Sequence, residues 1–223
     1  MHENTTKNIY PTGIEYLPIS LISKDLKILI IGAGKAALIK TKTFLRKGCS
    51  VTIISKEIKE DFKLLEHNQN LNIINEEYSI EFIKDKHLIV IAINDKLKVD
   101  EIIKDCDEYS KIYLNCTDFS KGKFLLPISD GTKSIEFSIH TKGGNPKISQ
   151  YLKTKVKENL EEYDEFVDFA IEIRKMIKNN ENKKEILSFI ATEDFRFIFN
   201  KGKAVITLKI FFGGEIFEDK ISY

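Results

Sequence analysis

The 223-residue chain contains no tryptophan, two methionines and only three cysteines, Cys49, Cys106 and Cys116. Three cysteines cannot all pair with one another, and no two of them stand at the CxxC spacing of redox and zinc motifs. This scarcity excludes a disulfide framework of the kind that holds small secreted domains together, and it predicts reduced thiols in a cytoplasmic protein. The sequence also has no HxxxH and no cluster of potential ligands, so we expect no dedicated metal site.

Long hydrophobic runs and an excess of one charge are missing as well. No apolar run approaches the roughly 20 residues that span a bilayer, and the stretch MHENTTKNIYPTG lacks the basic start and apolar segment of a secretion signal. The chain carries 35 Lys and Arg residues against 34 Asp and Glu residues, without aromatic residues interleaved among the basic ones. We therefore expect neither a membrane nor a nucleic acid as a partner.

The most informative segment is LKILIIGAGKA, residues 26–36. Its apolar run is continuous rather than alternating, which is typical of a parallel strand that helices cover on both faces. Gly32 and Gly34 follow, with Ala37 at the third position of a GxGxxA motif. Between a buried strand and a helix, this motif predicts a turn that approaches a pyrophosphate closely. The alternative is a plain strand–turn–helix unit without a ligand.

Strand and helix signals alternate through the first half of the chain, and this order predicts a doubly wound parallel sheet. The expected strands are residues 27–31, 51–54, 71–74, 88–93 and 112–115. The expected helical segments there are residues 35–47, 58–67 and 97–109, with a short turn at 80–84. We predict an α/β protein with three regions, a Rossmann-type domain at 1–115, a small mixed segment at 116–147 and a helical region at 148–223.

The regions after residue 115 give weaker signals. Residues 134–139 alternate apolar and polar side chains, which predicts a strand with one wet face. Helical patterns begin at Pro146 and continue over 164–178 and 183–191. The segment AVITLKIFF favours a strand by its β-branched residues, although its neighbours are helical.

Polar residues follow the predicted strands. Ser55 stands where dinucleotide-binding folds usually carry an acid, with Lys56 and Glu57 beside it. Lys56 either accepts the 2′-phosphate of NADP or remains solvated, so the residues alone leave the choice between NAD and NADP open. Asn94, at the end of the fourth strand, is expected near the nicotinamide, while Asp95 lines the site, caps the next helix or does both.

Asp118 follows the fifth predicted strand in the tetrapeptide NCTD, residues 115–118. Ligands of open α/β sheets bind outside the carboxyl ends of the strands, so this carboxylate is expected in the crevice. There it can accept a proton while a hydride leaves to the nicotinamide. The alternative is an aspartate in a surface turn.

The order of these motifs resembles the precorrin-2 dehydrogenase family of siroheme and cobalamin biosynthesis, over about residues 14–160. The resemblance rests on YLPISL at 16–21, GAGKAALIK at 32–40, VIAIND at 90–95, NCTD at 115–118, Phe124, Pro127 and TKGGNPKISQYLKTKVKENL at 141–160. The double glycine before a proline is the most specific of these motifs, because generic Rossmann enzymes lack it. Some siroheme synthases carry a serine immediately before it, where this chain has Lys142.

The resemblance implies oxidation of precorrin-2 to sirohydrochlorin, with NAD rather than NADP as the hydride acceptor. In some members the insertion of iron or cobalt follows. It also implies a homodimer that forms through the central segment, and a catalytic role for Asp118. The implied cofactor contacts are Gly32, Gly34, Lys35, Ala36, Ser55, Lys56 and Glu57, in addition to Asn94.

The central segment is rich in lysine, with nine lysines and three acids between Lys111 and Lys157. A basic wall along a cleft would attract a tetrapyrrole that carries carboxylates. The expected substrate contacts are Lys121, Lys123, His140, Lys142, Gly143, Gly144 and Lys147. Solvated lysines and a structural histidine are the alternatives.

Two other functions fit the same fold. A non-catalytic NAD(H)-sensing regulatory module would need a basic DNA-reading helix, which neither end of the chain clearly shows. The second alternative is another NAD(P)-dependent reductase of small molecules. The common short-chain reductases need a Tyr-x-x-x-Lys pair beside the site, and none is evident there.

Overall fold

The computed structural model describes residues 14–142, 145–214 and 217 of the chain. The chain divides into two compact units, Met1–Leu126 and Pro127–Tyr223. The boundary between the units lies inside the segment 116–147, which the sequence predicts as one region. Each unit is described by itself below.

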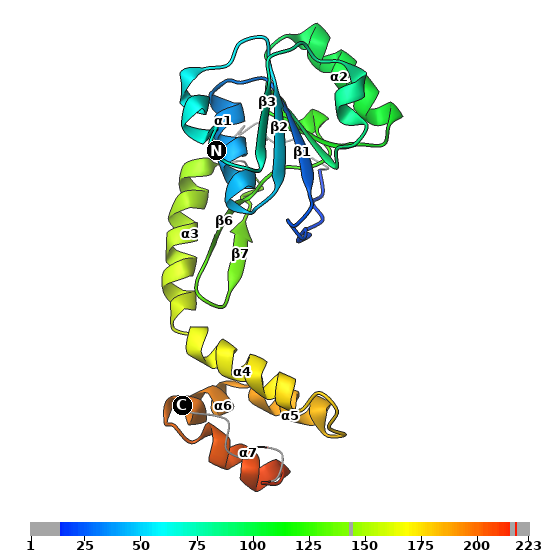
Figure 1. Cartoon of the computed structure of the whole chain (residues 1–223). Coiled ribbons are helices and arrows are strands. Elements are labelled where there is room, and N and C mark those ends of the chain that lie inside the picture. The colour runs from blue at the N-terminus through cyan, green and yellow to red at the C-terminus, as the bar shows by residue number, and fades with distance from the viewer. Residues whose placement is uncertain (1–13, 143–144, 215–216, 218–223) are drawn as a thin grey trace, which may run out of the picture. The chain divides into compact units, whose positions relative to one another are not determined.

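A five-stranded sheet forms the centre of the first unit (Figure 1). Its strands are β1 (Lys27–Ile31), β2 (Ser50–Ile54), β3 (Leu71–Ile74), β4 (Leu88–Ile91) and β5 (Ile112–Asn115). They lie in the order β3-β2-β1-β4-β5, and every neighbouring pair is parallel. The predicted Rossmann-type sheet is thereby confirmed, and the chain reverses its direction of winding between β1 and β4.

Helices cover both faces of this sheet, because alternate residues of each strand point to opposite sides. Ile28 and Ile30 of β1 pack in the cluster that contains α1 (Lys35–Arg46) and Phe62 of the 3₁₀ helix η1 (Glu60–Leu65). The sequence predicts a helix at 58–67, and the structure has the shorter 3₁₀ helix η1 there.

Leu29 and Ile31 of β1 pack on the other face of the sheet. Their cluster includes residues of α2 (Lys96–Glu108) and of the 3₁₀ helix η2 (Ile80–Ile83). All four β1 residues from Ile28 to Ile31 are almost completely buried, as a strand covered on both faces requires.

The second unit begins with an antiparallel ribbon of β6 (Ile128–Gly131) and β7 (Glu136–Ile139), against which α3 (Pro146–Glu161) packs. Asp130 of β6 pairs with Lys153 of α3 at 2.9 Å and with Lys157 at 3.5 Å. The helix begins where the sequence predicts, with Pro146 in its first turn and Asn145 as its cap.

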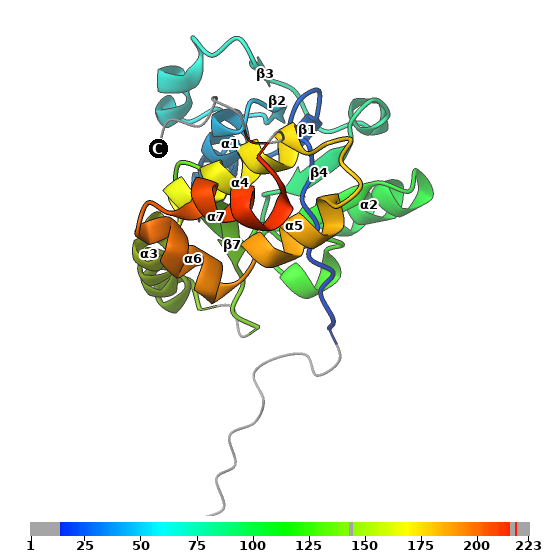
Figure 2. The same cartoon turned by 90° about the horizontal axis from the view of Figure 1, so that it is seen from below.

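Four further helices pack around a phenylalanine-rich core, and Figure 2 looks directly onto them. They are α4 (Asp164–Met176), α5 (Lys183–Ile190), α6 (Glu193–Asn200) and α7 (Ala204–Phe212). Phe169 and Phe195 are completely buried at the centre, with ring centroids 6.2 Å apart. The strand signal of AVITLKIFF is wrong, since these residues form α7, and neither α6 nor β6 was expected from the sequence.

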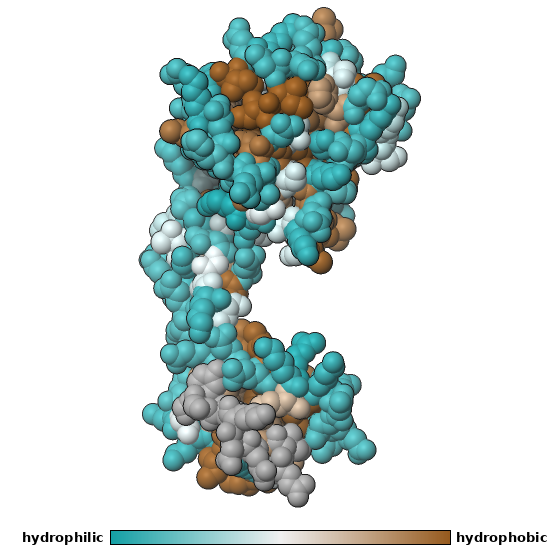
Figure 3. Space-filling view, viewed as in Figure 1, coloured by the Kyte–Doolittle hydropathy of each residue, from teal (hydrophilic) through white to brown (hydrophobic). Residues whose placement is uncertain are grey.

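Hydrophilic side chains cover most of the face that Figure 3 shows, with hydrophobic residues exposed in separate patches. Among the described residues, no helix is both long enough and apolar enough to cross a membrane.

Candidate functional site at the carboxyl edge of the sheet

The first residue of the turn after β1, Gly32, has no room for a side chain. Gly32 has φ of +104°, a conformation that side chains with a Cβ atom rarely adopt. A Cβ atom on Gly32 would lie 2.6 Å from the carbonyl oxygen of Ala92 and 2.8 Å from Cγ2 of Ile93. The turn after β1 therefore lies directly against the end of β4, at the point where the sheet reverses its winding and where open α/β sheets bind ligands.

The first turn of α1 is open to an anion. Gly34 is its N-cap residue, and a Cβ atom there would meet nothing within 4 Å. Among the residues that the structure describes, no side chain caps this helix; its first turn holds no acid, and Lys35 and Ala36 are exposed. The free N–H groups at the helix N-terminus and the open space beside Gly34 fit the pyrophosphate of NAD or NADP.

The adjacent strand ends are stabilised by short local contacts. The Ser55 hydroxyl donates a hydrogen bond to the carbonyl oxygen of Glu57 at 2.8 Å, which closes a turn after β2. Lys56 forms an ion pair with Glu77, which follows β3. With its amide nitrogen facing the β2 end, Asn75 donates to the carbonyl oxygens of Ser55 and Lys56 at 2.9 and 2.7 Å.

Asn94 and Asp95 follow β4 and are both exposed. The Asp95 carboxylate accepts a hydrogen bond from the backbone N–H of Lys98 at 3.2 Å and caps α2, which confirms the capping interpretation.

Asp118 follows β5 and is held in a fixed orientation. The buried side chain of Asn115 accepts hydrogen bonds from the backbone N–H groups of Thr117 at 3.0 Å and Asp118 at 3.3 Å. The Oδ1 atom of Asp118 accepts from the N–H of Ser120 at 3.1 Å and from its hydroxyl. Within the described part of the chain, Oδ2 of Asp118 has no hydrogen-bond partner, so one carboxylate oxygen of this half-buried residue remains available.

These segments share one edge because the strand ends are in register. Ile74, Ile54, Ile31, Ile91 and Asn115 are neighbours across the sheet. In spatial order, the segments that follow them are residues 75–77, 55–57, 32–34, 92–95 and 116–118. The sheet thus brings the glycine turn and the segments of Ser55, Asn94 and Asp118 to the same edge.

Lys40 is a candidate site residue that sequence reasoning did not single out. It lies in α1 and is half-buried, and this burial lowers the pKa of its ammonium group while the nearby Cys116 opposes the shift. Burial in turn raises the pKa of the Cys116 thiol, against the effect of Lys40. A positive charge thus lies beside the segment that leads to Asp118. Lys40 lies next to the buried residues Ala37, Thr41 and Phe44 of α1, and no motif in the sequence marks it.

The predicted substrate contacts fall in both units. In the first unit, Lys121 pairs with Asp100 at 3.6 Å, and Lys123 pairs with Asp107 and lies 5.4 Å from the Tyr113 ring centroid.

In the second unit, His140 is half-buried after β7, and Lys142 and Lys147 are exposed. Gly143 and Gly144 lie outside the described residues. The part of the chain that the structure describes holds no group of three or more His, Cys, Asp or Glu side chains that could bind a metal ion.

Comparison with known proteins identifies the family. Residues 19–128 match the family described as "Putative NAD(P)-binding". A "Putative precorrin-2 dehydrogenase" of Methanocaldococcus jannaschii is 30% identical over 195 residues, which are 81% of this chain and 92% of that protein. The chain belongs to the precorrin-2 dehydrogenase family.

Other relatives agree with this membership in the precorrin-2 dehydrogenase family. The precorrin-2 dehydrogenase of Priestia megaterium is 23% identical, with 80% of this chain and 90% of that protein covered. A siroheme synthase of Buchnera aphidicola is 28% identical, but the match covers only 30% of its length. The fold of this chain is also that of the solved structure of SirC, precorrin-2 dehydrogenase, which superposes with a TM-score of 0.67 at 21% identity, over 88% of this chain and all of that one.

Proposed function

We propose that this protein catalyses the NAD-dependent oxidation of precorrin-2 to sirohydrochlorin. One observation carries the proposal: the turn that begins at Gly32, where a Cβ atom has no room, leads to an uncapped helix N-terminus at the same sheet edge as Asp118. The family to which the chain belongs supplies the substrate, and the site supplies a cradle for the cofactor and an acid beside it.

NAD, when bound, supplies the acceptor for one hydride from the reduced macrocycle. The N–H groups of Lys35 and Ala36 bind its pyrophosphate, while Ser55, Lys56 and Glu57 contact the adenosine ribose and Asn94 the nicotinamide side. Oδ2 of Asp118 accepts the proton that the macrocycle loses with the hydride. Ser120 and Asn115 hold Asp118 in orientation through the hydrogen bonds described above.

The carboxylates of the substrate require positive partners. We propose Lys121, Lys123, His140, Lys142, Lys147 and the glycines Gly143 and Gly144 as substrate contacts. The ion pairs of Lys121 and Lys123 involve exposed side chains. Exposed pairs of this kind contribute little, so a tetrapyrrole carboxylate can replace the aspartate partner.

The direct test is to mix the purified full chain with precorrin-2 and NAD⁺ and to record NADH absorbance together with sirohydrochlorin formation. We expect one NADH for each sirohydrochlorin. NADH without sirohydrochlorin, or neither product, would contradict the proposal. Ferrous or cobaltous ion added afterwards, as substrate, tests the metal insertion that some relatives perform.

We also propose a homodimer that forms through the central segment 116–147, and we add α3, which follows it, to the proposed interface. A two-stranded ribbon is marginally stable alone, and of the described residues between Ile128 and Glu161 only Ser149 is buried. On α3, Ile148 and Tyr151 are 48% and 59% exposed, one helical turn apart. A second copy of the chain would cover this apolar stripe.

Light scattering after size-exclusion chromatography measures the oligomeric state. We expect a dimer for the wild type and a monomer for Tyr151→Lys, whereas Gln150→Lys, on an exposed neighbouring position, should remain dimeric. A wild-type monomer, or an unchanged Tyr151→Lys dimer, would refute this interface.

We propose a cytoplasmic location on the evidence of the cysteines. Cys49, Cys106 and Cys116 are all free, and the first two are buried. Free thiols are typical of a reducing compartment, and fractionation of the cells that make the protein would test this location.

A further inference from the structure

The end of β2 lacks the acid that normally excludes NADP from dinucleotide-binding folds. That acid accepts a hydrogen bond from the ribose 2′-hydroxyl and repels a 2′-phosphate, and Ser55 occupies its position here. Lys56 comes next, and a lysine at this place is a suitable partner for a 2′-phosphate. Considered without the residues after β3, the end of β2 would therefore favour NADP over NAD.

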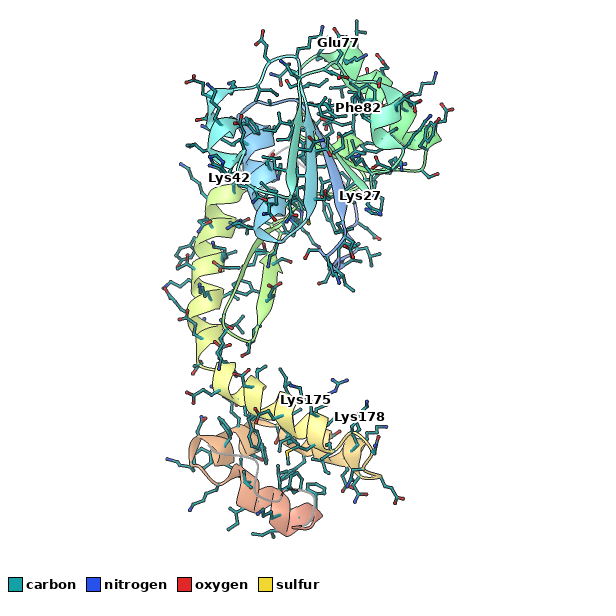
Figure 4. All side chains as sticks on the ribbon, in the orientation of Figure 1. Lys27, Lys42, Glu77, Phe82, Lys175 and Lys178 are labelled. Atoms are coloured by element: carbon teal, nitrogen blue, oxygen red, sulfur yellow. The ribbon has the colours of Figure 1, made fainter. Side chains whose placement is uncertain are left out.

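The neighbouring strand changes this conclusion. Glu77 follows β3, and its Oε1 atom forms an ion pair with the Nζ atom of Lys56 across the ends of β2 and β3. Figure 4 labels Glu77 at the end of the sheet opposite to Lys27, where β1 begins, so Glu77 lies at the carboxyl edge. Asn75 braces the same pair of strand ends through its hydrogen bonds to Ser55 and Lys56.

Glu77 is ionised in this position. Its hydrogen bond to Lys56, and the charges of Lys56 and Lys98, lower the pKa of its carboxyl group. Lys98 of α2 is itself held by Glu101 at 2.8 and 2.9 Å. The Glu77 carboxylate therefore keeps its negative charge at neutral pH and neutralises Lys56.

We propose that Glu77 determines the preference of this protein for NAD over NADP. Its negative charge neutralises Lys56, a lysine that a 2′-phosphate could use at the end of β2, and repels that phosphate. Glu77, which follows β3, thus adds a negative charge beside the position that Ser55 occupies at the end of β2, where Glu57 lies two residues further along the chain. The inference rests on the proposed function, since it assumes that the dinucleotide binds at the turn after β1.

The ion pair has little structural role, which makes the inference testable. The side chains of Lys56 and Glu77 are 69% and 61% exposed, and exposed pairs contribute little to folding stability. Replacing Glu77 should therefore change cofactor binding without unfolding the first unit.

Isothermal titration calorimetry of the full chain with NAD⁺ and with NADP⁺ tests the proposal. In Glu77→Gln we expect the Kd for NADP⁺ to fall on the order of tenfold, since Lys56 is released and a like charge is removed. The Kd for NAD⁺ should stay within about twofold, because NAD carries no 2′-phosphate. Glu77→Ala is a second variant with the same expected result.

Two controls sharpen the experiment. The double variant Lys56→Gln/Glu77→Gln should lose the gain in NADP⁺ affinity, and Glu76→Gln, an exposed neighbour, should bind as the wild type does. An unchanged ratio of the two Kd values in Glu77→Gln and Glu77→Ala, or an equal gain in either control, would overturn the role of Glu77. If the wild type binds neither dinucleotide, the proposed function fails together with this inference; if it binds NAD⁺ and the ratio is unchanged, only the inference fails.

Discussion

Replacing the two glycines after β1 one at a time separates folding from cofactor binding. In Gly32→Ala, the new Cβ atom would lie 2.6 Å from the Ala92 carbonyl oxygen, in a residue whose φ is +104°. The backbone conformation costs about 1–2 kcal/mol, and the forced displacement of Ala92 and Ile93, which follow β4, costs about 1–3 kcal/mol more. We therefore expect a loss of about 2–5 kcal/mol in the free energy of unfolding of the first unit.

Gly34→Ala should behave in the opposite way. Its backbone has φ of −87°, and the added Cβ atom would meet nothing within 4 Å. The loss of stability should stay below about 1 kcal/mol, the cost of alanine at an N-cap. The methyl group would, however, stand in the open space that fits the pyrophosphate, so we expect weaker NAD⁺ binding.

Differential scanning calorimetry and titration calorimetry measure the two effects on the same samples. A loss of 2–5 kcal/mol corresponds to a fall in Tm of roughly 8–20 °C for a unit of this size. Gly32→Ala with the wild-type Tm would refute the steric argument. Gly34→Ala with the wild-type affinity for NAD⁺ would show that the cofactor does not approach α1 at this point.

Three further predictions concern the second unit. Phe195→Ala should cost about 3–5 kcal/mol in calorimetric unfolding, because Phe195 is completely buried; a loss below about 1 kcal/mol would mean that the helical core is not packed as described. Asp164→Ala should lower the Tm of this unit more than Glu165→Ala does, because Asp164 accepts hydrogen bonds from three consecutive residues, 132–134, in the β6–β7 turn; equal Tm values would contradict this. The pKa of Asp130 is lowered to about 2 by Lys153, by the Gly131 N–H and by Lys157. The contribution of the ionised Asp130 to the stability of the second unit is therefore complete above about pH 4 and is lost as the pH falls toward 2. In an acid titration, Asp130→Asn should not show this loss of stability.

The sheet was predictable because its signals are local. The apolar runs of β1 to β5 and the glycines between β1 and α1 are visible in any short window of sequence. Three of the five strand ranges coincide with those predicted, and the other two differ by one or two residues at one end.

The secondary-structure predictions fail where tertiary contacts determine whether a segment becomes a strand or a helix. Ile128 to Gly131 follows a proline and contains a glycine, so it has the composition of a turn, and it becomes a strand only by pairing with β7. The β-branched segment Ala204–Phe212 is a helix because Ala204 and Leu208, one turn apart, pack into the phenylalanine core.

The candidate site was predictable in part because some of its residues also have local sequence signals. Gly32, Gly34 and Asp118 stand directly at strand ends, so the order of elements brings them to one edge. The sequence does not indicate Glu77, because the proposed role of this residue depends on β3 lying next to β2 and on its ion pair with Lys56. Lys40 was overlooked because half-burial of a single lysine on an amphipathic helix is not visible in the sequence pattern.

Single-turnover kinetics of Asp118→Asn test the central claim most directly. Asparagine keeps the shape of the side chain and can still accept a hydrogen bond from the Ser120 N–H, but it cannot take a proton. With precorrin-2 and NAD⁺ as substrates, we expect Asp118→Asn to keep the wild-type affinity for NAD⁺ and to lose most NADH formation. The control variant Glu108→Gln replaces an exposed acid at the end of α2 and should form NADH at the wild-type rate. Wild-type NADH formation by Asp118→Asn would contradict the central claim.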